Sequence, residues 1–193
     1  MTRIALSRRT VLVASLFAPM LASAEEQSAN PSQRLVPTPE CDDDDMTPEQ
    51  SAGPYYKPSS PLKDDFTADA PEGRSLLLGG TIADSACKPL SGCMIEFWQA
   101  DQHGNYDNRG FRLRGHQFTD ALGRYMLQTI WPGLYPGRTR HIHIRIQPTS
   151  GGLLTTQVYF PDEPRNRSDL LFRPELLMRF DKEMSAGRFD FVV

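Results

Sequence analysis

Short apolar runs separated by turn-forming residues dominate the chain from about residue 75 onward. Six runs have the length and the β-branched or aromatic content of strands, and they lie at Leu76–Ile82, Met94–Trp98, Phe111–Thr119, Arg124–Thr129, His141–Gln147 and Thr155–Phe160. Residues rich in Gly, Pro, Asp and Ser separate them. Because no helix-length periodicity connects the runs, we predict an all-β fold, an antiparallel β-sandwich with long irregular loops. For Leu170–Phe180, which Pro174 interrupts, we expect a short helix or irregular cover.

The segment His141–Gln147 alternates strictly between apolar and polar residues. Its three isoleucines fall on one face of the predicted strand, and His141, His143 and Arg145 fall on the other. The two imidazoles therefore project side by side, with α-carbons about 7 Å apart. This spacing suits two ligands of one metal ion, and it equally suits a polar strand face that meets water.

Composition and charge narrow the class of protein. The chain has 193 residues, of which 39% are hydrophobic and 23% charged, with 16 prolines and a net charge of −3. These values indicate one domain with a packed core, and they argue against a helical bundle and against a nucleic-acid binder. No run of 18 apolar residues is present, so we expect no stable membrane insertion once the export signal is removed.

The first 24 residues have the organisation of an export signal. Arg8 and Arg9 precede an apolar stretch, Val11–Leu21, and a small-x-small cleavage pattern, Ala22–Ala24. The arginine pair resembles a twin-arginine signal, which carries folded proteins, although an ordinary secretory signal can also hold two arginines. We predict an exported, periplasmic protein with residues 1–24 as the signal, 25–46 as a flexible acidic linker and 47–193 as the β-sandwich domain.

Two cysteines flank a predicted turn. Cys87 and Cys93 enclose Lys88–Gly92 between two apolar runs, so they could face each other across a hairpin and form a disulfide after export. The alternative is two unpaired thiols buried as small apolar side chains. Cys41 is left over in either case.

Aromatic oxygens lie near the histidine strand in sequence. Tyr135 stands in the loop Trp131–Arg138 that leads into this strand, and Tyr106 follows the end of the strand Met94–Trp98. Phenolate is a hard anionic donor that suits trivalent iron better than zinc or calcium, and imidazole complements it. Without a metal the same residues would be ordinary loop aromatics.

Several ordered motifs resemble the intradiol ring-cleavage dioxygenases, nearest the branch that contains protocatechuate 3,4-dioxygenase. They are Gly53-Pro54-Tyr55-Tyr56, Cys87–Gly92 leading into Glu96–Ala100, Gly104-Asn105-Tyr106, Phe111–Gly115 with Thr119-Asp120, Tyr135–Arg138, His141-Ile142-His143 and Thr156–Phe160. Their order and spacing agree with the family over about residues 47–161.

The resemblance implies a site. The residues that match the family's four ligands of one non-haem Fe(III) per chain are Tyr106, Tyr135, His141 and His143, with Tyr135 and His143 as the axial pair. Arg138 matches an arginine that stabilises negative charge on the substrate, and Gln157 matches a glutamine near the iron. Either Tyr55 or Tyr56 corresponds to an aromatic residue on the substrate side.

The resemblance also implies a reaction. The partners are a catechol-type aromatic and O2, both oxygen atoms enter the product, and the ring opens between the two hydroxyl-bearing carbons to give a muconate-type diacid. Tyr135 can take one proton of the catechol if it leaves the iron as a phenol. The export signal and the short Tyr135–His141 stretch leave the identity of the catechol open. Whether the chain forms a homo-oligomer is left open as well.

Two other functions compete with this interpretation. One is an exported, metal-free β-sandwich that binds a ligand or partner through its loops. The other is a zinc hydrolase built on His141, His143 and a carboxylate such as Glu96 or Asp101. Outside these sets, Arg112 and Arg114 either meet an acidic substrate or form a solvated strand face, and Trp98 is expected in the core.

Overall fold

The structure is a computed structural model that describes residues 46–193. The predicted export signal, the linker up to residue 45 and Cys41 lie outside these residues. No helix in the described part of the chain has the length and apolar character needed to cross a bilayer.

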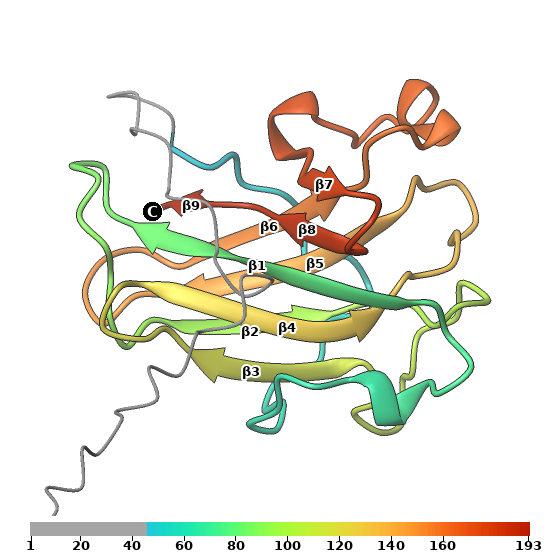
Figure 1. The fold of residues 1–193 in the computed structure, drawn as a ribbon, viewed down its shortest axis with the longest axis horizontal. Coiled ribbons are helices and arrows are strands. Elements are labelled where there is room, and N and C mark those ends of the chain that lie inside the picture. Colours follow the sequence, from blue (N-terminus) through green and yellow to red (C-terminus); the bar gives the residue numbers. More distant parts are fainter. Residues whose placement is uncertain (1–45) are drawn as a thin grey trace, which may run out of the picture. The chain divides into compact units, whose positions relative to one another are not determined.

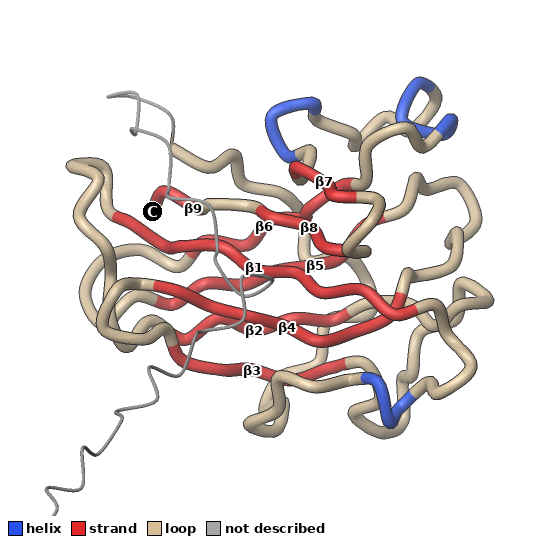
Figure 2. Tube along the Cα trace, in the orientation of Figure 1, coloured by secondary structure: helices blue, strands red, loops and turns tan. Residues whose placement is uncertain are grey.

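Two β-sheets form the domain (Figure 1). The strands of residues 46–193 are β1 (Ser75–Ala83), β2 (Met94–Trp98), β3 (Arg114–Phe118), β4 (Arg124–Ile130), β5 (His141–Gln147), β6 (Leu154–Tyr159), β7 (Arg179–Asp181), β8 (Ala186–Arg188) and β9 (Phe191–Val192). One sheet has the order β4-β1-β8-β7, with β9 also paired to β1, and the other has the order β3-β2-β5-β6. Short 3₁₀ helices occupy Thr67–Asp69, Pro164–Arg167 and Pro174–Leu176 (Figure 2).

The predicted all-β sandwich is confirmed. All pairings in the four-stranded sheet are antiparallel, and only β8 and β9 run parallel to their neighbour β1. Five of the six predicted strands agree with the structure to within about two residues. The remaining one, the third along the chain, begins at Arg114 rather than at Phe111. The chain before Arg114 is turned instead, because Asp107 accepts backbone hydrogen bonds from Gly110 and Arg112 and Leu113 has a φ of 54°. Leu170–Phe180 contains a single 3₁₀ turn and the start of β7, as irregular cover.

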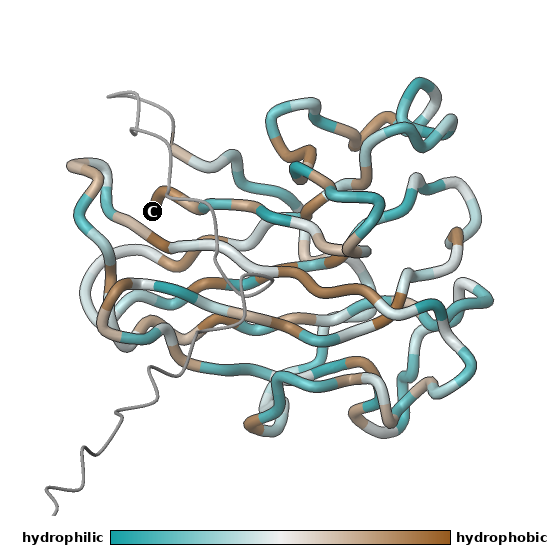
Figure 3. The backbone as a smooth tube through the Cα atoms, viewed as in Figure 1, coloured by the Kyte–Doolittle hydropathy of each residue, from teal (hydrophilic) through white to brown (hydrophobic). Residues whose placement is uncertain are grey.

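The hydrophobic core is built from residues of both sheets, and hydrophobic positions recur along several of their strands (Figure 3). Ile142, Ile144 and Ile146 of β5 are fully buried and belong to it, together with Leu78 of β1 and Leu127 of β4. Burying each such side chain contributes about 1.5–3 kcal/mol to folding. Because side chains alternate along a strand, His141 and His143 must point to the opposite face of the four-stranded sheet.

The residues before β1 cover part of that opposite face. The backbone N–H of Gln50 donates to the carbonyl of Thr155 at 2.7 Å, and the side-chain amide of Gln157, the cross-strand partner of His143, donates to the carbonyl of Ser51 at 3.1 Å. A Cβ at Gly53 would lie 3.5 Å from the His143 ring, so the covering segment reaches the histidine strand itself. The face that carries the histidines is therefore shielded from solvent rather than open.

No disulfide joins Cys87 and Cys93. Cys93 is a free thiol that is fully buried in the core cluster, which corresponds to the second of the two alternatives for this residue. Its backbone N–H is held by the hydroxyl of Thr119 at 2.9 Å. The turn that the sequence indicates between the two cysteines is present, with Gly92 at a φ of 71°.

Candidate metal centre

His141 and His143 place their Nε2 atoms 3.1 Å apart on the covered face of β5. Both side chains are buried, and burial lowers the pKa of His141 to about 4 and that of His143 well below its ordinary value. Both imidazoles are therefore neutral at pH 7. Nδ1 of His141 lies 2.7 Å from the carbonyl of Thr139, which can only accept, so Nδ1 carries the proton and Nε2 presents a lone pair.

Tyr106 joins the two histidines from the loop that follows β2. Its hydroxyl lies 3.2 Å from Nε2 of His141 and donates to that lone pair. Burial raises the pKa of Tyr106 well above the usual 10, although the charges of Arg138 and Arg114 oppose this effect. The side chain is thus a phenol until a cation displaces its proton.

Tyr135 lies next to Tyr106. Its ring centroid is 5.9 Å from that of Tyr106, and its hydroxyl forms a 2.8 Å hydrogen bond with the hydroxyl of Tyr55. Tyr55 stacks on Tyr106 at 4.6 Å with an interplanar angle of 11°. Tyr56 points elsewhere, because it donates to Glu96 and packs edge-on against Trp98. Of the two tyrosines that the sequence left open, Tyr55 is the one among the candidate ligands.

Arg138 is held beside the histidines by three side chains. Its Nε donates to Asp169 at 2.9 Å, and its Nη2 donates to Gln157 at 2.6 Å and to Tyr159 at 3.3 Å. Sequence reasoning missed Asp169 and Tyr159. Tyr159 could have been found, because it lies two residues from Gln157 on the same strand face, but no local pattern marks Asp169.

Four residues form a cross-strand row over the whole four-stranded sheet: Arg114 on β3, Trp98 on β2, His143 on β5 and Gln157 on β6. Directly opposed residues share a face of the sheet, with Cβ atoms about 5 Å apart. Trp98 is buried as expected, yet it stacks on His143 at 4.8 Å with an interplanar angle of 5°. Arg114 does not belong to a solvated strand face, since only 2% of it is exposed.

The carboxylates suggested for a zinc site have other partners. Asp101 accepts the backbone N–H groups of His103 and Asn105 in its own loop, both at 2.9 Å, and Glu96 accepts from Tyr56. In the part of the chain that the structure describes, no group of three His, Cys, Asp or Glu residues could hold a metal ion. The zinc hypothesis therefore lacks its third ligand.

The donor set that does converge fits ferric iron. Two neutral ring nitrogens 3.1 Å apart repel each other unless a proton or a cation lies between them. The phenol oxygen of Tyr106 lies 3.2 Å from the His141 nitrogen, and the ring centroid of a second phenol, Tyr135, lies 5.9 Å from that of Tyr106. Two imidazoles and two phenolates form a mixed nitrogen and hard-oxygen set of the kind that suits Fe(III).

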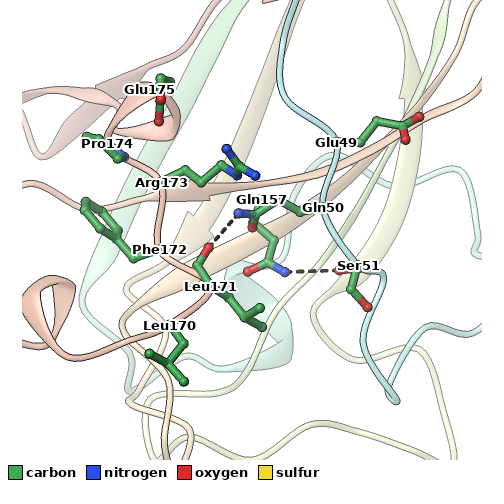
Figure 4. Close-up of a pocket in the computed structure, with 10 residues that line it drawn as sticks. All are labelled: Glu49, Gln50, Ser51, Gln157, Leu170, Leu171, Phe172, Arg173, Pro174 and Glu175. Atoms are coloured by element: carbon green, nitrogen blue, oxygen red, sulfur yellow. Dashed lines mark hydrogen bonds between the residues drawn. The ribbon is translucent and has the colours of Figure 1, made fainter.

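A pocket of about 410 Å³ lies next to Gln157 (Figure 4). Its walls are Glu49–Ser51, Gln157 and the loop Leu170–Glu175. The amide of Gln50 donates to the carbonyl of Leu171 at 2.6 Å, and the amide of Gln157 donates to the carbonyl of Ser51 at 3.1 Å, so both walls are tied in place. Gln157 is the cross-strand partner of His143, so one wall of the pocket lies directly beside a candidate ligand.

A family model described as a dioxygenase matches residues 51–192. The protocatechuate 3,4-dioxygenase beta chain of Burkholderia cepacia is 31% identical, with a match that covers 78% of this chain and 75% of that one. The chain belongs to the intradiol ring-cleavage dioxygenase family. It is thereby a ring-cleaving oxidoreductase by class, as the motifs predict.

Solved structures of this family have the same fold. The dioxygenase domain of a carbohydrate-binding fusion protein from Streptomyces sp. SirexAA-E is 51% identical with a TM-score of 0.75, over 77% of this chain and 98% of that one. Catechol 1,2-dioxygenase from Pseudomonas arvilla C-1 is 26% identical with a TM-score of 0.66, over 76% of this chain and 61% of that one. Against the hydroxyquinol 1,2-dioxygenase of Rhizobium sp. (strain MTP-10005), 29% identical, the match covers 56% of that relative.

Proposed function

We propose that this chain is a non-haem Fe(III)-dependent intradiol dioxygenase that cleaves a catechol-type aromatic with O2 between its two hydroxyl-bearing carbons. The observation that carries the proposal is the position of His141 Nε2, which lies 3.1 Å from Nε2 of His143 and 3.2 Å from the hydroxyl of Tyr106. Tyr135 is the fourth ligand in this proposal. Ferric iron supplies, when bound, the chelation of the two catechol oxygens and the electronic coupling to O2.

Tyr135 and Tyr55 handle a proton in this mechanism. A catechol loses two protons when it chelates a metal, and a phenolate of Tyr135 is a base within the site. Once Tyr135 is a phenol, its hydroxyl can form a hydrogen bond with the hydroxyl of Tyr55, which lies 2.8 Å away. Replacing Tyr55 with Phe removes this partner and should slow turnover, whereas Tyr56→Phe removes a hydroxyl that donates to Glu96 and has no contact with Tyr135 among the described hydrogen bonds.

Arg138 stabilises the negative charge that the substrate carries. Its guanidinium is held by Asp169 and Gln157, so it does not need to reorganise when charge develops. Removing one such fixed donor costs about 3 kcal/mol of transition-state stabilisation, which is about 100-fold in kcat. Arg138→Ala with wild-type kinetics would refute this role.

The pocket beside Gln157 is the proposed place for ring substituents. It holds about 410 Å³ and is lined by Leu170, Leu171 and Phe172 together with polar residues. Catechols with a substituent at a ring carbon remote from the hydroxyls should therefore show a higher kcat/KM than catechol itself. Equal values for bulky, carboxylated and unsubstituted catechols would remove the pocket from the substrate site.

Iron loading tests the whole proposal. The iron-loaded protein should show the visible absorption of a ferric phenolate and should consume O2 in equal amount to an added catechol. Tyr106→Phe should lose or shift the band and most of the activity, while a zinc hydrolase would tolerate this change. A colourless protein that binds a catechol without consuming O2 would instead support the metal-free binding module.

Export is a second part of the proposal and rests on the sequence alone. We infer that residues 1–24 direct the chain through the twin-arginine route to the periplasm, because Arg8 and Arg9 precede the apolar stretch. Replacing both arginines with Lys should retain the full-length chain in the cytoplasmic fraction. Periplasmic recovery of that variant, at the level of the unmodified chain, would favour the ordinary secretory route.

A further inference from the structure

Arg114 is a buried cation near the candidate metal centre. Only 2% of the residue is exposed, and in residues 46–193 no carboxylate lies within ion-pair distance of its guanidinium. Removing an ion from water costs several kcal/mol unless hydrogen bonds and charges compensate for it. A side chain that serves only to fill the space beside Trp98 would not need this charge.

The hydrogen bonds of Arg114 join two segments that are far apart in sequence. Its Nη1 donates to the backbone carbonyl of Tyr55 at 2.6 Å, and its Nε donates to the backbone carbonyl of Asp107 at 3.0 Å. Tyr55 belongs to the segment that covers the sheet, and Asp107 directly follows Tyr106. One guanidinium therefore holds the backbone on both sides of the stacked pair Tyr55 and Tyr106.

The sheet makes Arg114 a rigid point of attachment. Arg114 is the first residue of β3 and pairs with Trp98, which in turn pairs with His143 and stacks on its ring. The loop on the other side is also well defined, because the carboxylate of Asp107 accepts the N–H groups of Gly110 and Arg112.

We propose that Arg114 is a positioning residue for the reaction proposed above: its guanidinium sets the separation of Tyr55 from Tyr106 and thereby keeps the Tyr55 hydroxyl on Tyr135. This inference rests on the proposed function. The planar fork of Arg presents several donors in fixed directions, so it can satisfy two carbonyls at once. A Lys ammonium at the same position is a single point, and it can reach only one of the two carbonyls in a favourable direction.

Arg114→Lys and Arg114→Met test the proposal, with Arg112→Lys as a matched control. Arg112 lies two residues away and is exposed, and its guanidinium donates to the carbonyl of Asp69, so its replacement leaves Tyr55 in place. In crystal structures of the metal-free Arg114 variants we expect the 2.8 Å contact between Tyr55 and Tyr135 to be lost. In the iron-loaded Arg114→Lys protein we expect kcat to fall about 10- to 100-fold, the size of effect expected from a 1 Å displacement, with KM within about threefold of wild type.

The outcomes separate this proposal from the proposed function. An unchanged Tyr55–Tyr135 contact in both Arg114 variants overturns the positioning role, as does a lost contact with wild-type kcat. Failure of iron-loaded wild-type protein to consume O2 with any catechol overturns the proposed function, and the metal-free crystal structures then still decide whether Arg114 positions Tyr55. If Arg114→Met does not fold, the more conservative Arg114→Lys variant decides alone.

Discussion

Asp169→Asn is the most informative single test of how Arg138 is held. The Asp169 side chain is only 2% exposed and its partner Arg138 is 16% exposed. One carboxylate oxygen accepts from Nε of Arg138 at 2.9 Å and from the N–H of Thr139 at 2.7 Å, and the other accepts from the N–H of Leu171 at 2.9 Å. Asn preserves the shape but replaces one of these two oxygens with a donor.

The expected cost follows from these contacts. Removing one partner of a buried ion pair costs about 3–5 kcal/mol. The amide oxygen of Asn can keep the bonds from Arg138 and Thr139, so the loss comprises the charge and the bond from Leu171, each worth about 1–3 kcal/mol. We therefore expect Asp169→Asn to lower the free energy of unfolding by about 2–4 kcal/mol. We also expect it to lower kcat more than it raises KM, because the guanidinium of Arg138 would then be held by a neutral amide instead of a carboxylate.

The acid dependence of stability adds a second readout. Burial raises the pKa of Asp169, but hydrogen bonds from Thr139, Leu171 and Arg138 outweigh it, so the pKa lies below its usual value. A lowered carboxyl pKa contributes stability that is present above about pH 4 and is lost as the pH falls through the folded-state pKa. Urea unfolding of the metal-free protein at several pH values should therefore show a flatter decline below pH 4 for Asp169→Asn than for wild type.

The matched control is Asp162→Asn. Asp162 pairs with Lys182 on the surface, where both side chains are more than 70% exposed, and such exposed pairs contribute little. A change within about 0.5 kcal/mol is expected for this variant. If Asp169→Asn were equally mild and left kcat unchanged, the buried network around Arg138 would not support the site in the way described.

Two further predictions concern the ligand loops and the histidines. A Cβ at Gly104 would overlap the backbone carbonyl of Leu134, next to Tyr135, and Gly104 has a φ of +87°. Gly104→Ala should therefore reduce the iron content, measured by metal analysis, and destabilise the fold by at least about 2 kcal/mol, measured by thermal unfolding. Gly152→Ala is the control: its added Cβ meets no atom within 4 Å, so neither quantity should change. Burial lowers the pKa of His141 to about 4, so between about pH 6.5 and pH 4 the unfolded chain binds a proton at this residue and the folded chain does not. As the pH falls through this range, the metal-free protein should lose about 3 kcal/mol of stability. The His141→Gln variant should lack this part of the decline.

Much of the fold and of the candidate site could be predicted from local pattern. The alternation of His141–Gln147 places the isoleucines in the core and both histidines on the other face, as the structure shows. The apolar runs locate six of the strands, although a turn held by Asp107 shortens the third. The cysteines could not be settled in this way, because a hairpin-like spacing says nothing about which face each thiol occupies.

Long-range relations could not be predicted. Tyr55 and Tyr56 are adjacent, and only the packing of their segment decides that Tyr55 meets Tyr135 while Tyr56 turns to Glu96. Arg114 looked like a solvated strand residue, since an exposed and a covered sheet face have the same alternation of polar side chains. It is buried because residues from before β1 cover that face, a fact that no local pattern encodes.

The sequence by itself therefore determined which residue types could bind iron and on which strand face the two imidazoles project, because a strand has a period of two residues wherever it lies. The tertiary structure decided how those groups meet. Strand register places Arg114, Trp98, His143 and Gln157 in one row, and loop packing brings Asp169 to Arg138 across 31 positions of chain. Register and loop packing depend on contacts between distant segments, and these form only when the two sheets close on their common core.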